Sequence, residues 1–300
     1  MKLLLLLLLV TTIPMLIIRA EKPDDHRECL SGKATGKLIT MNGVKVYAAS
    51  AGSDRGQGKG KKAGIRKSMV GRRKAVLVFP DIFGIDLINI QLITDKLAAD
   101  LDVPAFLVDT FSGDDVPDGP QPNAMPVGFD IIEWQKRHGP QQILPLIGNV
   151  IKNLTDQGVQ RVAATGYCFG GKYVFLSLDR NWIQVGSTSH PSLLTIPNDP
   201  LELRAKSHGP LLINSCEFDP QFGAEAQKQT DAILGNGRYE PGYKRTYYPG
   251  ASHGFGIRAN LVVTLQKNAP LMNPTRRLSS GLMRTYDTNK RKKEKLLNLL

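Results

Sequence analysis

A cysteine with a glycine two residues away on each side carries the strongest chemical signal in this 300-residue chain. It lies between an apolar segment and a segment with helical spacing, in the motif Gly166-Tyr167-Cys168-Phe169-Gly170-Gly171. A nucleophile at such a strand-to-helix turn has a strained backbone, and small neighbours keep the turn free of clashes. The motif therefore indicates that the Cys168 thiolate attacks a carbonyl carbon. The alternative is a structural cysteine beside glycines that permit close packing.

An aspartate and a histidine follow later predicted strands in the order that such a nucleophile needs. Asp219 comes just after the apolar segment 210–216, and His253 follows the strand-like segment 243–248. His253 would take the thiol proton, and Asp219 would orient its imidazole ring. Each has a simpler alternative, a helix N-cap for Asp219 and a structural role for His253. The order nucleophile, acid, base, with each residue after a strand, favours a catalytic triad.

The same chemistry requires backbone N–H groups that stabilise an oxyanion. The residue after the nucleophile supplies one of them, which here is Phe169. The second is expected from the loop after the first long apolar strand, Asp81-Ile82-Phe83-Gly84, and we assign it to Ile82.

Strand-like and helical segments alternate along most of the chain. Short, wholly apolar runs suit parallel strands that are buried on both faces. Strands are predicted within 37–50 (two, joined by a tight turn at Asn42-Gly43) and at 75–80, 103–111, 161–165, 183–187, 210–216 and 243–248, and helices at 89–101, 129–137, 141–155, 170–178 and 222–234. Pro145 is expected to break or kink the third helix. The alternation predicts an α/β fold, a mostly parallel sheet with helices on both faces.

Three of these motifs together resemble the dienelactone hydrolase family. The motifs are Pro80–Gly84, Gly166–Lys172 and Pro249–Phe255, and the segments Ser189–Ser192 and Pro210–Glu217 are similar to the fungal branch of that family. The resemblance covers roughly residues 29–260. It implies the α/β-hydrolase fold and hydrolysis of a lactone or related ester through a cysteinyl acyl-enzyme. It also implies that the reaction needs no metal and no organic cofactor.

The resemblance assigns roles to two charged residues. Asp81 stands where the best-known members of the family carry Glu, whose carboxylate contacts the resting thiol and helps to activate it. The side chain of Asp81 is one methylene shorter. Arg258 is the best match for the arginines that hold the substrate carboxylate in the family.

Two other functions remain open at this point. A relative without activity would act as a binding or structural protein, and the complete set of Cys168, Asp219 and His253 argues against it. A basic surface protein would contact nucleic acid or anionic membranes, since the net charge is +12. The excess charge, however, is concentrated at 55–74, with nine Lys/Arg and no Asp/Glu, and at 276–295. We interpret these segments as a solvated loop and a solvated tail, and we expect no nucleic-acid partner.

An apolar run opens the chain. It extends from Leu3 to Ile18, is interrupted by Thr11, Thr12 and Pro14, and is shorter than the roughly 20 residues of a membrane-spanning helix. We predict a signal peptide at 1–20 and entry into the secretory pathway, with an uncleaved membrane anchor as the alternative.

The rest of the chain is predicted to form one hydrolase-like domain. It occupies 21–260, has a basic insertion at 51–74, and is followed by a basic segment at 261–300. We expect a monomer that takes a small-molecule lactone or ester. A disulfide between Cys29 and Cys216 is compatible with an oxidising compartment, and Asn153 begins the one usable glycosylation sequon.

Overall fold

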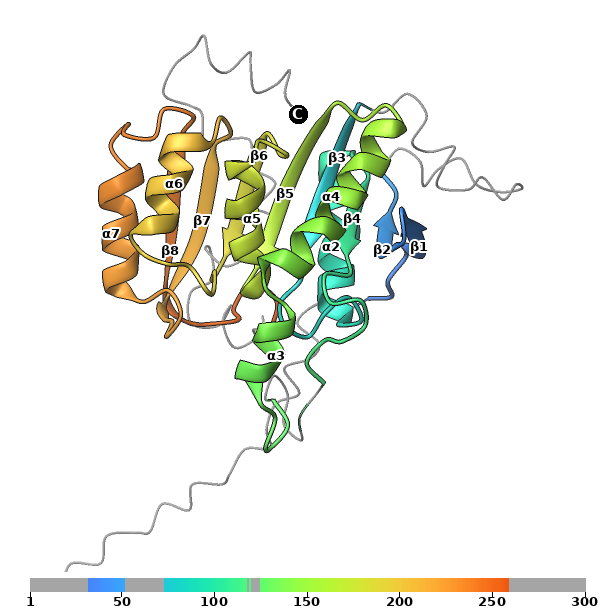
Figure 1. Cartoon of the computed structure of the whole chain (residues 1–300), viewed down its shortest axis with the longest axis horizontal. Coiled ribbons are helices and arrows are strands. Elements are labelled where there is room, and N and C mark those ends of the chain that lie inside the picture. Colours follow the sequence, from blue (N-terminus) through green and yellow to red (C-terminus); the bar gives the residue numbers. More distant parts are fainter. Residues whose placement is uncertain (1–31, 52–72, 118, 120–124, 259–300) are drawn as a thin grey trace, which may run out of the picture.

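An eight-stranded sheet forms the centre of the described part of the chain, residues 32–51, 73–117, 119 and 125–258 of a computed structural model (Figure 1). The elements in chain order are β1 Lys37–Met41, β2 Val44–Ala49, β3 Lys74–Phe79, α2 Ile88–Leu101, β4 Ala105–Val108, α3 Ile131–Arg137, α4 Pro140–Asp156, β5 Arg161–Tyr167, α5 Phe169–Asp179, β6 Val185–Ser189, α6 Asn198–Lys206, β7 Leu211–Phe218, α7 Ala224–Leu234 and β8 Tyr243–Ser252. All eight of these strands and five of these six helices were predicted from the sequence.

The strands lie in the order β1-β2-β4-β3-β5-β6-β7-β8. Strands β3 to β8 run parallel to one another, and β2 pairs antiparallel with both β1 and β4. The β1–β2 hairpin turns at Asn42 and Gly43, whose φ angles of 44° and 85° are those that this dipeptide tolerates. Because β3 to β8 are parallel, their carboxyl ends meet at one edge of the sheet, where sites of open α/β sheets assemble.

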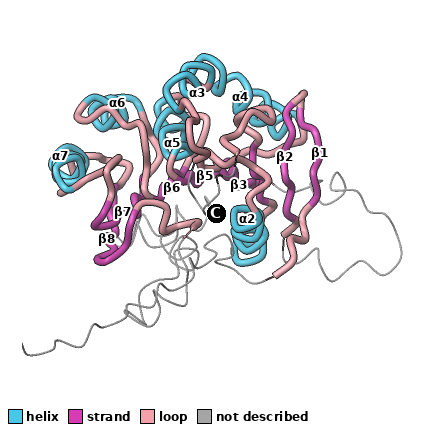
Figure 2. Tube along the Cα trace, turned by 90° about the horizontal axis from the view of Figure 1, so that it is seen from below, coloured by secondary structure: helices cyan, strands magenta, loops and turns pink. Residues whose placement is uncertain are grey.

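Helices cover both faces of the sheet, as predicted (Figure 2). Helix α2 lies on one face, where Ile90 packs in a cluster with Val76 and Val78 of β3. Helices α3 to α7 lie on the other face, where alternate β3 residues such as Leu77 join the α5 side chain Val174 in a second cluster. Burial on both faces is the reason that β3 is apolar along its length.

Helix α6 is the one described helix that the sequence did not predict. Only Pro200 and Leu203 of α6 are buried, so its apolar periodicity is too weak to indicate a helix. A tertiary contact holds it in place: Lys172 Nζ of α5 lies 2.6 Å from Asp199 Oδ2, and both side chains are largely shielded from solvent.

Of the predicted break or kink at Pro145, the break does not occur: α4 runs from Pro140 to Asp156 through this residue. Pro145 lies near the start of the helix and is exposed. The hydrogen bond that Pro145 cannot donate would go to the carbonyl of Gln141, in the first turn of the helix, where the residue itself is exposed.

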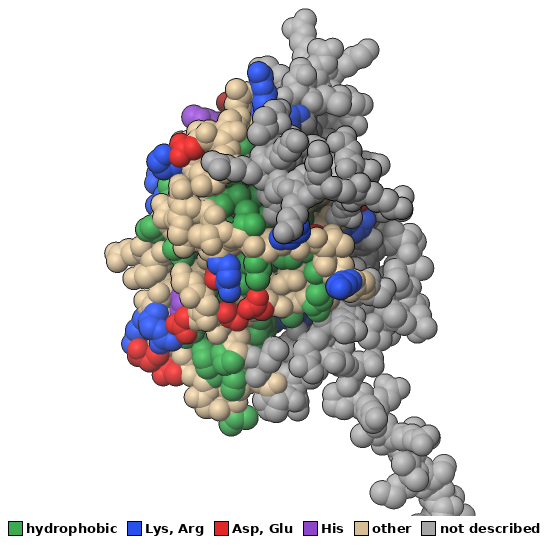
Figure 3. Space-filling model, turned by 90° about the vertical axis from the view of Figure 1, so that its right-hand side faces the viewer, with side chains coloured by type: hydrophobic (Ala, Val, Ile, Leu, Met, Phe, Trp, Pro, Cys, Tyr) green, Lys and Arg blue, Asp and Glu red, His purple; other side chains and the backbone are tan. Residues whose placement is uncertain are grey.

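Several predictions fall on residues that the structure does not describe. They are the signal peptide at 1–20, most of the insertion at 51–74, the segment 261–300, and Cys29 with its disulfide. In the described ranges, no helix combines the length and the apolar character that crossing a membrane requires. One face of the molecule, seen in Figure 3, shows acidic and basic side chains side by side.

Candidate active site

Cys168 sits in a sharp turn between β5 and α5. Its φ and ψ angles are 50° and −113°. Residues other than glycine rarely adopt this backbone conformation, and those that do are often found at functional sites. Glycines make the turn possible. A Cβ on Gly166 would collide with the backbone carbonyl of Gly170, and a Cβ on Gly170 would collide with that of Phe79. The turn therefore holds the thiol at the carboxyl end of β5.

The structure brings Cys168, Asp219 and His253 together in a hydrogen-bonded chain. Cys168 Sγ lies 3.1 Å from His253 Nε2, and His253 Nδ1 lies 2.8 Å from Asp219 Oδ1. The three residues follow β5, β7 and β8, and the His253 amide donates to the Phe218 carbonyl at 2.9 Å. That bond ties the end of β8 to the end of β7 and sets the imidazole beside the carboxylate. The arrangement can transfer a proton between sulfur and imidazole.

The Asp219 carboxylate is fully buried and carries two functions at once. Its Oδ1 accepts hydrogen bonds from the amides of Gln221 at 2.9 Å and Phe222 at 3.0 Å, as a capping residue would. Burial alone would raise the pKa of Asp219, but the bond and charge of His253, together with these amides, keep it below its ordinary value. The capping alternative and the orienting role are therefore compatible, because the cap fixes the carboxylate toward the imidazole.

The Cys216 thiol contacts the other oxygen of the Asp219 carboxylate. Cys216 Sγ is 3.7 Å from Asp219 Oδ2. Burial, followed by the charge of Asp219, raises the pKa of the Cys216 thiol, so the group stays protonated and can donate. Cys216 thus supports the carboxylate, and its thiol is free in the described structure.

His253 is held in its charged form by its two partners. Burial lowers the pKa of His253, but the hydrogen bonds to Asp219 and Cys168, and the charges of both, raise it to about 9. Its side chain is 17% exposed, so the imidazole edge is within reach of solvent. The favoured resting state at neutral pH is accordingly an imidazolium beside sulfur.

Ser192 is a neighbour of the reacting atoms whose role sequence reasoning missed. Its Oγ lies 3.2 Å from Cys168 Sγ and 3.5 Å from His253 Nε2. The Ser192 amide also donates to the Cys168 carbonyl at 2.9 Å, which fixes its loop against the turn. A usable signal existed, since Ser189–Ser192 continues a predicted strand with polar residues at its carboxyl end.

Ser192→Ala is expected to slow acylation by roughly 10- to 100-fold, because a hydrogen bond to a charged group is worth roughly 1.5–3 kcal/mol. The hydroxyl would donate to the thiolate and favour it over the thiol. The measurement is the rate of Cys168 alkylation across a pH series, beside kcat/KM for an activated ester. An unchanged alkylation profile in the folded variant would show that Ser192 only packs there.

His190 follows β6 and is fully buried beside the triad. Its ring centroid lies 4.9 Å from that of His253 in an edge-to-face arrangement, and neither of its ring nitrogens has a hydrogen-bond partner among the described residues. Burial, then the charges of His253 and Arg258, lowers its pKa well below the ordinary value. His190 is therefore an uncharged imidazole at neutral pH.

The two predicted oxyanion donors, Phe169 and Ile82, lie in the segments that follow β5 and β3. Phe169 is the first residue of α5, where an amide has no partner within its own helix. Ile82 lies in the turn after β3, closed by the Gly84 amide on the Asp81 carbonyl at 3.2 Å. Their action on an oxyanion stays a prediction.

Asp81 and Arg258, the two charged residues singled out by resemblance, meet in the structure. Arg258 Nε lies 3.4 Å from Asp81 Oδ2, and the Phe83 amide donates to Asp81 Oδ1 at 3.1 Å. The Asp81 side chain is fully buried, and that of Arg258 is largely buried. The structure thus pairs the two residues, while thiol activation by Asp81 and substrate binding by Arg258 remain to be tested.

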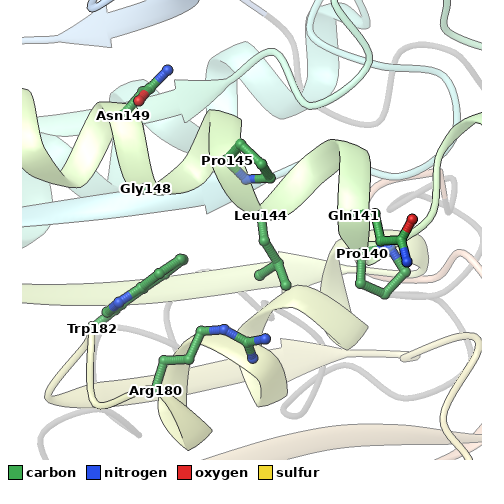
Figure 4. Close-up of a pocket in the computed structure, with 8 residues that line it drawn as sticks. All are labelled: Pro140, Gln141, Leu144, Pro145, Gly148, Asn149, Arg180 and Trp182. Atoms are coloured by element: carbon green, nitrogen blue, oxygen red, sulfur yellow. The ribbon is translucent and has the colours of Figure 1, made fainter.

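A groove of about 550 Å³ lies elsewhere, between α4 and the segment after α5 (Figure 4). It is lined by Pro140, Gln141, Leu144, Pro145, Gly148, Asn149, Arg180 and Trp182. None of these side chains is a nucleophile with a base beside it. The groove is therefore not the candidate reaction site.

Comparisons with known proteins agree with the geometry. Residues 63–270 match the sequence profile of the Dienelactone hydrolase family. Hydrolase pyvD of Aspergillus violaceofuscus is 33% identical over 199 residues, which cover 65% of this chain and 75% of that protein. Hydrolase tropI of Talaromyces stipitatus is 32% identical over 195 residues, covering 62% and 72%.

A solved structure agrees at the level of the fold. The dienelactone hydrolase-like promiscuous phosphotriesterase from metagenomic libraries aligns with a TM-score of 0.53 at 18% identity, over 88% of this chain and 94% of that one. With the sequence profile and the fungal relatives, this confirms the predicted resemblance: the chain belongs to the dienelactone hydrolase family and has the α/β-hydrolase fold.

Proposed function

We propose that this protein hydrolyses a carboxylic ester or lactone of a small molecule through a thioester on Cys168. The observation that carries the proposal is the continuous chain from Cys168 Sγ through His253, 3.1 Å away, to Asp219, a further 2.8 Å from the ring. Membership of a family of hydrolases supports a reaction of this class, and we assign the oxyanion to the amides of Phe169 and Ile82.

In the acylation half, the Cys168 thiolate attacks the carbonyl carbon and the carbonyl oxygen becomes an oxyanion. The amides of Phe169 and Ile82 stabilise that charge. The C–O bond then breaks, and the His253 imidazolium gives its Nε2 proton to the leaving oxygen. An ester releases its alcohol at this step. A lactone keeps the new hydroxyl tethered to the acyl group.

In the deacylation half, neutral His253 takes a proton from water, and the hydroxide attacks the thioester carbon. A second oxyanion forms at the same amides and collapses with release of the Cys168 thiolate. The net change is ester plus water to acid plus alcohol. Asp219 transfers no proton, and it holds Nδ1 so that Nε2 faces sulfur and substrate in both halves.

Arg258 is the side chain that we assign to an acidic group on the substrate. The guanidinium is paired with Asp81 at 3.4 Å, so a substrate carboxylate would have to share or take over that partner. Such an exchange would loosen the Asp81–Arg258 ion pair as substrate binds, and we assign thiol activation by Asp81 to that step.

Mass spectrometry of the intact protein after brief exposure to lactones and activated esters tests the proposal. Acid quenching should trap an acyl adduct, and peptide mapping should place it on Cys168. Cys168→Ala is the control and should take up no adduct. Adducts elsewhere, or turnover without any adduct on Cys168, would overturn the proposal and favour a binding or structural relative.

The pH profile of kcat/KM for an activated ester should fall as pH rises through about 9. The pKa of His253 is raised to about 9, so its proton is present below that pH and lost above it. Asp219→Asn removes the charge and hydrogen bond that hold this proton, so the alkaline limb should move to lower pH. Identical alkaline limbs in wild type and folded Asp219→Asn would contradict the assignment.

A further inference from the structure

The triad is part of a larger cluster of metal-binding groups. One ligand atom each from Cys168, His190 and His253 lies within 4.8 Å of the other two. A thiolate and two imidazoles are a ligand set that Zn²⁺ prefers, and three protein ligands with one open position are common at zinc sites. The proposed ester hydrolysis uses Cys168 and His253, but it assigns no role to His190.

His190 supplies the observation that points to a ligand. It is fully buried, and both of its ring nitrogens have no hydrogen-bond partner among the described residues. A buried polar atom without a partner costs free energy, so a group that binds it would be favoured. The rings of His253, Tyr167 and Phe255 lie next to the His190 ring, but none of them makes a hydrogen bond to a His190 nitrogen.

Asp219 already holds His253 as a zinc-bound histidine is held. Metal-ligating histidines commonly donate their second ring N–H to a carboxylate, which fixes the tautomer. The 2.8 Å contact of His253 Nδ1 with Asp219 provides this and leaves Nε2 toward sulfur. Nearby charges also affect the binding of a cation at this cluster. The negative charge of Asp219 favours binding. The positive charge of Arg258 opposes it, but Asp81 Oδ2, 3.4 Å from Arg258 Nε, offsets that charge.

The distances between the three ligand atoms fit a zinc site after small movements of the side chains. Zn–S of about 2.3 Å and Zn–N of about 2.0–2.1 Å place tetrahedral ligands about 3.3–3.6 Å apart. Cys168 Sγ and His253 Nε2 are 3.1 Å apart, and the His190 atom lies within 4.8 Å of both. Cys168 Sγ and His253 Nε2 need to separate slightly, and the His190 nitrogen needs to approach them by up to about 1.5 Å.

We infer that Cys168, His190 and His253 form a site for Zn²⁺ or a similar soft divalent cation, and that occupancy switches hydrolysis off reversibly. The metal replaces the proton shared by Cys168 and His253, which leaves to solvent, and the sulfur lone pair that would attack a carbonyl binds the metal instead. Metal binding stands on the geometry alone. The loss of activity rests on the proposed function.

Calorimetry of the full-length, chelator-treated protein with Zn²⁺ tests the binding. Wild type should bind one ion at this site, and His190→Asn should weaken that binding by about 100-fold or more, since loss of a group that merely hydrogen-bonds to a metal ligand already costs about 10- to 100-fold in affinity. Asn suits the positive φ of 41° at this position. His208→Asn, the same change at an exposed histidine, should bind as wild type does. A site built elsewhere, for instance with His26 or Cys29, would be unaffected by His190→Asn.

Two further measurements identify the ligand sulfur and the consequence. Titration with Cd²⁺ should give a thiolate-to-metal charge-transfer band that Cys168→Ala abolishes. Zn²⁺ should block alkylation of Cys168 in wild type, which needs no variant to fold. It should also stop ester hydrolysis until a chelator is added, with each protein compared with its own metal-free rate.

The outcomes separate the two claims. Unchanged Zn²⁺ binding in folded His190→Asn, no binding by wild type, or full or increased turnover with the site occupied would each overturn the inference. Metal binding that depends on Cys168 and His190, in a protein that hydrolyses no ester and forms no adduct, would instead support the site and overturn the proposed function.

Discussion

Cys168→Ala is expected to lower ester hydrolysis by about 10⁴-fold or more while leaving the protein folded. The sulfur is the atom that bonds to the substrate carbonyl in the proposed reaction, and no described side chain can replace it there. Ser192 Oγ, 3.2 Å away, is a hydroxyl and so a far weaker nucleophile than a thiolate. Any residual rate should come from the oxyanion donors acting on water.

The measurement is kcat/KM for an activated ester, with circular dichroism and thermal unfolding as folding controls. Alanine is smaller than cysteine and has the same Cβ, so it adds no strain to this turn, and the unfolding temperature should stay near that of wild type. Cys216→Ala also removes a buried thiol, but one that contacts Asp219 rather than the reacting sulfur, so it should cost far less activity than Cys168→Ala. Wild-type turnover in folded Cys168→Ala would defeat the functional proposal.

His253→Ala should cost nearly as much as Cys168→Ala. The imidazole is the proton acceptor and donor in both halves of the reaction, and its Nε2 is 3.1 Å from sulfur. Its loss removes the cation beside the thiolate as well as the acid for the leaving oxygen. Asp219→Asn should lose less than either, since Asp219 orients the ring and transfers nothing.

Residues that act as one unit are not additive, so Cys168→Ala combined with His253→Ala should be little worse than either change alone. A double-mutant cycle on kcat/KM measures this. His138→Ala is a suitable control for removing a buried histidine, because His138 packs against Trp134 and not the triad. If the two losses multiplied, the residues would be acting independently and the triad assignment would be wrong.

The sheet and the triad could be predicted because each depends on a local pattern. Leu77 and Val78 of β3 face opposite clusters, and that double burial is visible as an uninterrupted apolar run. Cys168 is marked by glycines that its turn requires, and Asp219 and His253 come directly after strands. Once parallel strands are predicted, residues at their carboxyl ends must be neighbours.

Other features depend on contacts between distant segments and leave no local signal. Helix α6 is held by the ion pair of Asp199 with Lys172 on another helix, which periodicity cannot indicate. The approach of Ser192 to sulfur and the burial of His190 depend on the path of the loop after β6. Likewise, Asp81 meets Arg258 only because β3 and the segment after β8 end at the same edge of the sheet.

The order of these segments also fixes when the site can exist during synthesis. Cys168 is 85 residues ahead of its base in the chain, and His253 follows β8, the last described strand. A nascent polypeptide that has completed β5 to β7 therefore exposes a thiol without its imidazole partner. Such long-range contacts are among the last to form on a slow, non-local folding route. The chain consequently carries an unactivated nucleophile until β8 docks, and reactivity appears only with completion of the sheet.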